Sequence, residues 1–106
     1  MKHKVSELSG ALLDAAVAKA EGTSLPHGNP RAYRPSMNWR QGGPIIERER
    51  MFVAPEFVGG TYYGNWRAIV YGFEDQGERA EETGPGPLIA AMRAYVASKF
   101  GEEIEL

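Results

Sequence analysis

The sequence predicts an α+β fold in which residues 1–106 form one two-layer domain. Two segments with the apolar spacing of amphipathic helices lie near the two ends of the chain. Between them lies a stretch rich in aromatic and β-branched residues, the composition of an antiparallel hairpin. Neither helix is stable alone, so both must bury their apolar stripes within the same domain.

Bulk composition excludes several classes of protein. A chain of 106 residues has room for one hydrophobic core and not two. The net charge of -2 gives no overall attraction to nucleic acid. There is no cysteine, which excludes disulfides, thiol nucleophiles and thiolate metal sites. No apolar run approaches a membrane span, and the start MKHKVSEL lacks a secretory signal, so we expect a cytoplasmic protein and no membrane partner.

The segment SGALLDAAVAKAEG predicts the first helix. Ser9 suits its N-cap, and Gly22 suits the position after its last turn. Apolar side chains recur on one face at helical spacing, whereas the charged residues fall elsewhere. That predicted face consists of Leu12, Leu13, Ala16, Val17 and Ala20.

Residues 22–37 carry three prolines and two glycines without periodicity, which predicts an irregular loop. A loop of this length is unusual in a compact domain, and such loops are often functional or mobile. Its second half contains two arginines and a tyrosine.

The segment NWRQGGPIIERER predicts two helical turns separated by a joint. Asn38 can cap the first turn with Gln41 as its capping-box partner, and Gly42 suits the end of that turn. Pro44 is favoured at a first helical position, so a short helix over 44–50 is preferred, with a strand following it. A strand over 44–50 stays open as the alternative, because successive residues also divide into two alternating sets: Ile45, Glu47, Glu49 and Met51 on one side, and Ile46, Arg48 and Arg50 on the other. The predicted joint explains both glycines without a ligand.

The segments MFVAPEF and NWRAIVYGF predict the two strands of a hairpin, since VGGTYYGN between them supplies turn residues. Pro55 makes the first an edge strand or introduces a bulge. Both tyrosines are expected near the tip. In the second strand we expect Trp66, Ala68 and Val70 on one face and Arg67, Ile69 and Tyr71 on the other.

The last third of the chain predicts an acidic loop and a second long helix. Residues 74–86 include EDQGERAEETG, whose excess of negative charge predicts a solvated loop. In PGPLIAAMRAYVASKFG, Pro87 suits the first helical position and Gly101 the stop. The expected stripe consists of Leu88, Ala91, Met92, Tyr95, Val96 and Phe100.

The expected core is formed by the largest apolar side chains of the two helices, each worth about 1.5 to 3 kcal/mol when buried. On this basis the substitution Phe100→Ala is expected to cost about 3 to 5 kcal/mol. The set consists of Leu12, Leu13, Val17, Met92, Val96 and Phe100.

Three blocks of the sequence, in this order, resemble a known family: VSELSGALLDAAVAKAEG, NWRQGGPIIERER and PLIAAMRAYVASKFGEEIE. The family is the NinX-like group of small tailed-phage and prophage proteins, a domain of unknown function. The resemblance implies a phage or prophage protein in the cytoplasm of a bacterial host, and it supplies no activity. The chain departs from the family pattern in a longer hairpin region and in Ala16, where a tryptophan is common.

The sequence predicts no catalytic site, no metal site and no cofactor. His3 and His27 lack metal-ligand spacing, and no serine lies in a nucleophile elbow. Glu47 and Glu49 are more readily explained as solvated charges than as an acid–base pair. The glycine pairs match no phosphate loop. Backbone N–H groups of a helix starting at Pro44 leave a weak anion-binding candidate at Gly43 and Ile45. The preferred interpretation is that the glycines only mark a turn.

A recognition surface is the stronger candidate, because aromatics interleave with arginines in a mixture enriched at binding hot spots and able to stack on bases. For Trp39 alone, the preferred interpretation is an anchor that holds the long loop on the domain. The sheet face with Arg67 and Tyr71 extends the surface if no helix covers it. The remaining candidates are Arg31, Tyr33, Arg34, Trp39, Arg40 and Gln41.

The leading hypothesis is therefore a non-enzymatic phage accessory protein that binds a host or phage protein. The alternative is a nucleic-acid-binding accessory protein using the same loop, which would show strong salt dependence. An enzyme using a carboxylate, with Glu47 as the best candidate, is the third hypothesis. A homo-oligomer formed through the exposed hairpin edge also stays open.

Overall fold

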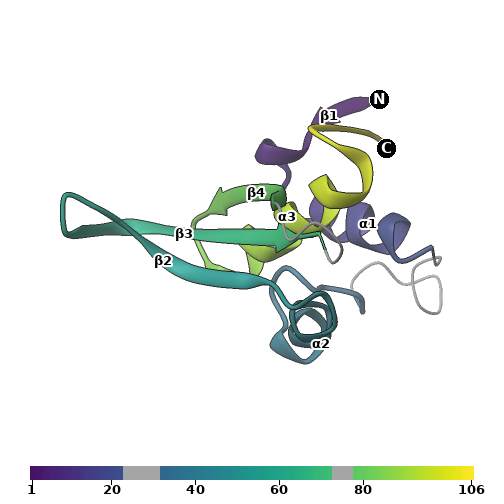
Figure 1. Cartoon of the computed structure of the whole chain (residues 1–106). Helices are drawn as coiled ribbons and strands as arrows, with labels where there is room; N and C mark the ends of the chain where they lie inside the picture. Colours follow the sequence, from purple (N-terminus) through teal and green to yellow (C-terminus); the bar gives the residue numbers. More distant parts are fainter. Residues whose placement is uncertain (23–31, 73–77) are drawn as a thin grey trace.

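The computed structural model describes residues 1–22, 32–72 and 78–106 (Figure 1). The described parts form one α+β domain, which confirms the predicted fold class. Its helices are the 3-10 helix η1 (Val5–Glu7), α1 (Gly10–Ala20), α2 (Trp39–Glu49) and α3 (Pro87–Phe100). Its strands are β1 (Lys2–Lys4), β2 (Phe52–Val58), β3 (Thr61–Tyr71), β4 (Glu78–Gly84) and β5 (Glu103–Glu105).

The central sheet is antiparallel in the order β2-β3-β4. The predicted hairpin is confirmed, and both tyrosines lie near its tip. β2 is an edge strand, and its pairing with β3 shifts register between Pro55 and Phe57, as the proline predicted. Of the expected β3 faces, Ala68 and Val70 are buried as predicted, but Ile69 on the opposite face is buried as well, at 6% exposure.

The predicted acidic loop over 74–86 is wrong for its described part, because residues 78–84 form strand β4. This strand pairs with β3 from Trp66↔Gly84 to Tyr71↔Glu78. Charged side chains are common on edge strands, where they discourage pairing with other chains. Acidic composition therefore marked a sheet edge and not the absence of structure.

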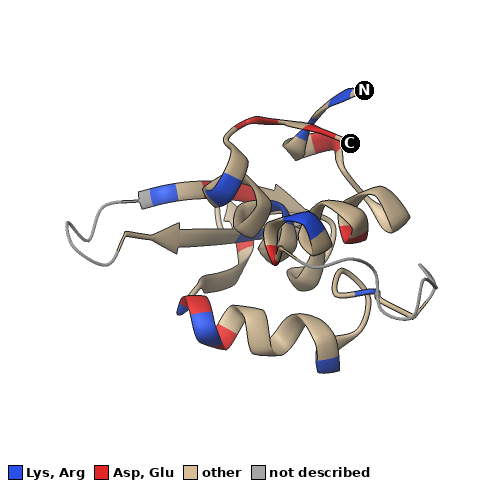
Figure 2. Ribbon diagram, turned by 90° about the vertical axis from the view of Figure 1, so that its right-hand side faces the viewer, with Lys and Arg blue, Asp and Glu red and all other residues tan. Residues whose placement is uncertain are grey.

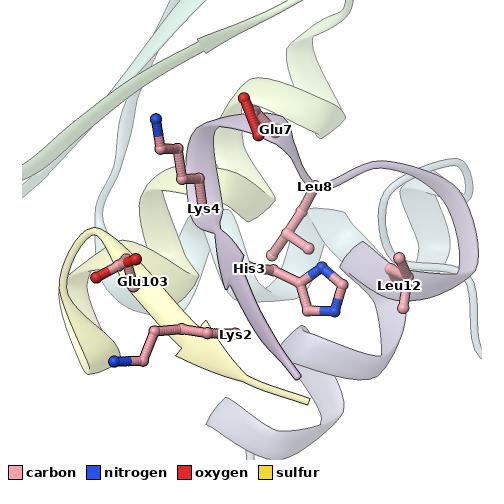
Figure 3. Close-up of a pocket in the computed structure, with 7 residues that line it drawn as sticks. All are labelled: Lys2, His3, Lys4, Glu7, Leu8, Leu12 and Glu103. Carbon is pink, nitrogen blue, oxygen red and sulfur yellow. The ribbon is translucent and has the colours of Figure 1, made fainter.

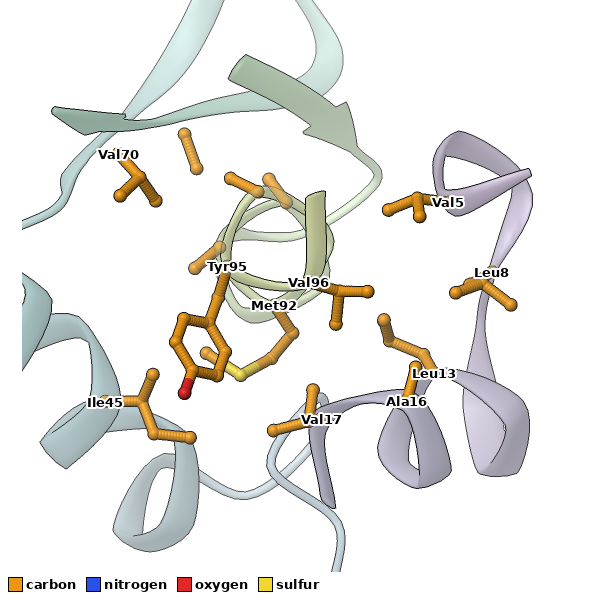
Figure 4. Close-up of a cluster of buried hydrophobic side chains, with 14 of the residues drawn as sticks. Val5, Leu8, Leu13, Ala16, Val17, Ile45, Val70, Met92, Tyr95 and Val96 are labelled. Atoms are coloured by element: carbon orange, nitrogen blue, oxygen red, sulfur yellow. The ribbon is translucent and has the colours of Figure 1, made fainter. Parts of the chain in front are cut away.

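Helix α3 is the centre of the core (Figure 4). It packs against the sheet on one side and against α1 and α2 on the other, so it is buried almost all round. Pro87 begins it and Gly101, with φ 85°, follows its last residue, as predicted. The expected stripe is buried except for Phe100, which is 38% exposed, so the full burial on which the predicted cost of Phe100→Ala depended is not met.

Helix α1 turns a slightly different face inward than predicted. Leu13, Ala16 and Val17 are fully buried, whereas Leu12 is 48% exposed. Ser9 occupies the N-cap, although its side chain makes no capping hydrogen bond. Asp14 is buried on the inner face, and its carboxylate accepts a hydrogen bond from the Ser36 N–H.

The terminal strands β1 and β5 pair with each other, which the sequence analysis did not predict. Opposite charges face each other across this ribbon, at Lys2↔Glu105 and Lys4↔Glu103. Ile104 between them is 4% exposed and joins the core, which gives the ribbon an apolar attachment. Among the residues that the structure describes, no helix is both long and apolar enough to cross a membrane.

Helix α2 is one continuous helix of 11 residues, with Pro44 inside it. The predicted cap at Asn38 is confirmed, since its side chain accepts a hydrogen bond from the Arg40 N–H at 2.9 Å. The predicted break at Gly42 and restart at Pro44 are wrong, and the strand alternative is wrong as well. The helix ends where Arg50 takes the left-handed conformation, with φ 52°.

Close packing explains why the helix continues through Gly42. A β-carbon at Gly42 would overlap the Pro35 carbonyl oxygen and lie 2.7 Å from Leu88 Cδ2. Gly43 has no β-carbon to clash with the Pro44 ring, which eases the helical conformation of a residue before proline. Gly42 is therefore needed for a close contact inside a helix, and neither glycine marks a joint between helices.

Candidate functional site

Residues 32–38 are held against α1 and α2 by three side-chain hydrogen bonds. The buried Asp14 carboxylate accepts from the Ser36 N–H at 2.9 Å. Gln41 donates from Nε2 to the Ala32 carbonyl at 2.7 Å, and its Oε1 accepts from the Arg34 N–H at 2.6 Å. Gln41 was predicted as a capping partner and as a contact residue, but both ends of its amide bind this segment. It is a positioning residue for the loop.

Trp39 points outward, with 57% of its surface exposed beside Met37 at 60%. It is therefore not the anchor that the sequence analysis preferred. Gly43, one turn further along α2, leaves space beside the ring. A β-carbon added at Gly43 would lie 4.0 Å from Trp39 Cε3. An open depression of about 340 Å³ adjoins the ring and is lined by Arg34, Met37, Asn38 and Trp39.

The arginines beside Trp39 differ from the other candidates. Arg34 and Arg40 are exposed, and in residues 1–22, 32–72 and 78–106 neither guanidinium has an ion-pair partner. Tyr33 is half-buried against the core, and burial raises the pKa of its hydroxyl. Arg31 lies outside the described residues. We define the Trp39 surface as Arg34, Met37, Trp39 and Arg40.

The predicted extension through Arg67 and Tyr71 lies on β3, away from α2 in the sequence. The Arg67 guanidinium is shared by Glu81 at 3.2 Å and Glu56 at 3.5 Å. Its charge is already neutralised, so it has less to offer a ligand than Arg34 or Arg40. Tyr71 is 38% exposed.

The hairpin carries a second exposed surface that the sequence analysis did not select. We define the hairpin arm as residues 56–65, the part of the hairpin beyond the Trp66↔Gly84 pair with β4. Figure 1 shows it projecting from the domain. The signal that could have revealed it is a run without charge between Glu56 and Arg67. Its most exposed apolar residues are Phe57, Val58, Tyr62 and Tyr63.

The family model described as bacteriophage P22, NinX, matches residues 4–99. This chain belongs to the NinX family. The match confirms the predicted resemblance and identifies a phage protein, and it spans both the Trp39 surface and the hairpin arm. No curated protein matches the chain.

The weak anion-binding candidate of this NinX-family chain is wrong. Helix α2 begins at Trp39, so Gly43 and Ile45 lie within it and not at its positive end. Ile45 is also buried at 3% exposure. The prediction failed because it relied on a helix start at Pro44.

A charged cluster joins the end of α1 to the end of α2 in this NinX-family domain. Figure 2 shows basic and acidic residues next to each other at one end of α2. The Arg48 guanidinium donates to both carboxylate oxygens of Glu21, at 3.0 and 2.8 Å, and to the Tyr95 hydroxyl at 3.2 Å. The Tyr95 hydroxyl donates to Glu21 in turn. Burial alone would raise the pKa of Glu21, but hydrogen bonds from Arg48 and Tyr95 hold it below its usual value.

The same cluster bears on the carboxylates considered for catalysis. Glu49 accepts from Arg48 Nε at 3.0 Å, so it belongs to the cluster, whereas Glu47 is exposed on α2. Burial, followed by the hydrogen bond to Glu21, raises the pKa of Tyr95 well above its usual value and keeps its hydroxyl protonated. Each polar group is satisfied by a neighbour, which indicates a structural clamp between α1, α2 and α3.

His3 lies beside a pocket of about 300 Å³ at the terminal ribbon (Figure 3). Its ring is near the apolar side chains of Leu8 and Leu12, while Lys2 and Lys4 point away from it. Within the described part of the chain, no group of three or more His, Asp or Glu side chains could hold a metal ion. His27 lies outside the described residues.

Proposed function

We propose that the chain is a non-enzymatic phage or prophage accessory protein that acts in the host cytoplasm by binding a host or phage protein through the Trp39 surface. The observation that carries this proposal is the exposure of Trp39 beside Met37, at 57% and 60%. Tryptophan and arginine are the residues most enriched at binding hot spots, and methionine is enriched at interfaces.

The surface is also rigid, which lowers the entropic cost of binding. Trp39 is the first residue of α2, directly after the Asn38 cap. Gln41 fixes the backbone at Arg34, and the buried contact of Gly42 with Pro35 fixes that segment against the helix. A ligand therefore meets side chains whose backbone is already ordered.

Photo-crosslinking followed by affinity measurement tests this proposal. With p-benzoylphenylalanine at position 39, the chain is expected to crosslink to a single protein in phage-carrying host cells. The isolated partner should then bind the Trp39→Ala/Arg40→Ala variant at least about tenfold more weakly than wild type, as expected for hot-spot residues. Lys99→Ala, at the end of α3, is the matched control for loss of an exposed cation. Equal affinities for wild type and double variant would reject the proposal.

Nucleic-acid binding is the second candidate function, and one observation favours it. Arg34 and Arg40 flank an exposed aromatic ring and have no ion-pair partner among the described residues, as a phosphate- and base-binding surface requires. Two phosphate contacts predict a slope of log K against log salt of about -1.5. Anisotropy titrations of single- and double-stranded DNA and RNA at low salt test it, and flat curves would exclude it.

A further inference from the structure

The hairpin arm is an ordered extension of the central sheet. β3 has 11 residues, but β4 pairs only with its part from Trp66 to Tyr71. Beyond that point β3 pairs with β2 alone, through Phe57↔Tyr62 and Val58↔Thr61. Gly59 and Gly60 both have positive φ and close the turn at the tip.

A row of aromatic side chains runs from the core out along one face of the arm. Trp66 is partly buried and packs against the core. Its Nε1 donates to the Tyr62 hydroxyl at 3.1 Å, and the Tyr62 ring lies 6.0 Å from that of Phe57. These rings are held by each other, so the exposed apolar surface has a fixed shape. This face continues the side of the sheet that α3 covers at its base.

Beyond Glu56 at its base, the arm carries no charge. No Lys, Arg, Asp or Glu occurs from Phe57 to Trp66. The charges at the base of the arm, Glu56 and Arg67, form an ion pair at 3.5 Å, and Arg67 also pairs with Glu81 at 3.2 Å. A surface of this kind is complementary to an uncharged apolar surface and has nothing to offer phosphate groups.

We propose that the hairpin arm inserts into an uncharged, apolar groove of a partner protein. This inference rests on the proposed function as a protein-binding module and adds a second contact surface. Three large rings and a valine, all about half exposed or more, together present roughly 400 to 500 Å² of apolar surface, divided between the two faces of the arm. A groove that encloses the arm can cover both of its faces.

A second copy of this chain is a poor candidate for the partner that binds the hairpin arm. Two arms pressed face to face would bury well under about 1,000 Å², because only one face of each arm is covered, and this is below the range of stable interfaces. The pockets beside the terminal ribbon and β4 are lined largely by charged side chains, such as Lys4, Glu82 and Glu103, so they are not apolar receptors for the arm. The depression beside Trp39 is open and carries the charge of Arg34. Pro55 also removes one N–H donor from the β2 edge, which weakens strand pairing between copies.

The inference is tested by photo-crosslinking at the arm. p-Benzoylphenylalanine is placed at Tyr63, the most exposed ring of the arm, and separately at Leu12 on α1 as a control exposed apolar position. In phage-carrying host cells, crosslinking from position 63 and not from position 12 is expected. The crosslinked protein is then purified and titrated with wild type, Phe57→Ser/Tyr63→Ser and Trp39→Ala.

We expect the arm variant to bind at least tenfold more weakly than wild type, with circular dichroism unchanged. If the arm variant binds as wild type while Trp39→Ala weakens binding, the arm inference fails and the proposed function stands. If neither variant changes the affinity, both fail. Crosslinks only to a second copy of this chain would overturn the inference. So would arm-dependent flotation with phosphatidylethanolamine–phosphatidylglycerol vesicles, which would make a membrane the occupant.

Discussion

Gly42 in α2 touches the Pro35 carbonyl oxygen so closely that no side chain fits between them. Leu88 of α3 closes the same site from the other side, with Cδ2 2.7 Å from the β-carbon position. This contact brings the loop segment, α2 and α3 together beneath the Trp39 surface. The effect of this contact on stability can be measured by adding a single methyl group at position 42.

Gly42→Ala is expected to destabilise the fold by about 1 to 3 kcal/mol, since overpacking forces the backbone of residues 32–38 away from the helix. Urea denaturation measures the change in the free energy of unfolding. Gly43→Ala is the matched control, because its β-carbon has ordinary contact distances. Higher helix propensity favours that variant by about 1 kcal/mol, and the clash with Pro44 opposes it, so a small net change is expected. Equal losses at both glycines would contradict the packing argument.

Asp14→Ala is expected to cost about 1 to 3 kcal/mol, because it leaves the buried Ser36 N–H without its acceptor. Asp14→Asn keeps an acceptor oxygen and should lose less. Thermal unfolding of the two variants gives the comparison. Similar losses for Ala and Asn would show that the carboxylate charge matters more than the hydrogen bond.

Phe100→Ala is expected to cost less than Met92→Ala. Met92 is fully buried, so its truncation should cost about 2 to 5 kcal/mol. Phe100 is 38% exposed, so folding removes only part of its apolar surface from water and the stabilisation is smaller. Lys19 Nζ lies 5.8 Å from the centre of that ring, which adds only a small cation–π contribution at an exposed site. Denaturant midpoints for both variants test the order, and the reverse order would be inconsistent with the packing described.

Glu21 should make stability fall at acid pH. Its folded pKa is lower than its unfolded value near 4.5, so its stabilising contribution is present above that value and is lost as pH falls through the folded pKa. Glu21→Gln is expected to cost roughly 1 kcal/mol at neutral pH, because Arg48 is half exposed and solvent screens the pair. The loss should shrink in urea titrations below the unfolded pKa. A loss independent of pH would exclude the ionised pair as its cause.

Glu82 should have the opposite effect. Burial raises its pKa, Arg93 partly offsets this, and Glu102 and Glu81 raise it further. A raised folded pKa means that stability is lost as pH rises through that value. Glu82→Gln is therefore expected to stabilise the fold at neutral pH by less than about 1 kcal/mol, since the side chain is partly exposed. The gain should disappear below about pH 4, and a gain that persists there would have another origin.

Local signals predicted the elements whose ends are set by neighbouring residues. Pro87 and Gly101 bound α3 because each fixes or permits a particular backbone conformation. The hairpin was predictable for the same reason, since glycines stand where φ is positive at its turn.

Features that depend on distant residues were not predictable. From the sequence alone, Gly42 and Pro44 indicate a helix break. The structure shows a continuous helix in which Pro35 and Leu88 leave no room for a side chain at position 42. Residues 78–84 form a strand in spite of their acidic composition, because they pair with β3. The exposure of Trp39 depends on whether another segment covers it, and the spacing of nearby residues carries no information on that.

The central position of α3 also bears on how the protein is made. The helix follows α1, α2 and the whole sheet in the sequence, yet it is the element on which they all pack. During synthesis, the inward faces of those earlier elements have no cover until α3 has left the ribosome. The nascent chain therefore exposes apolar surface until α3 is available, and exposed apolar surface is what chaperones bind.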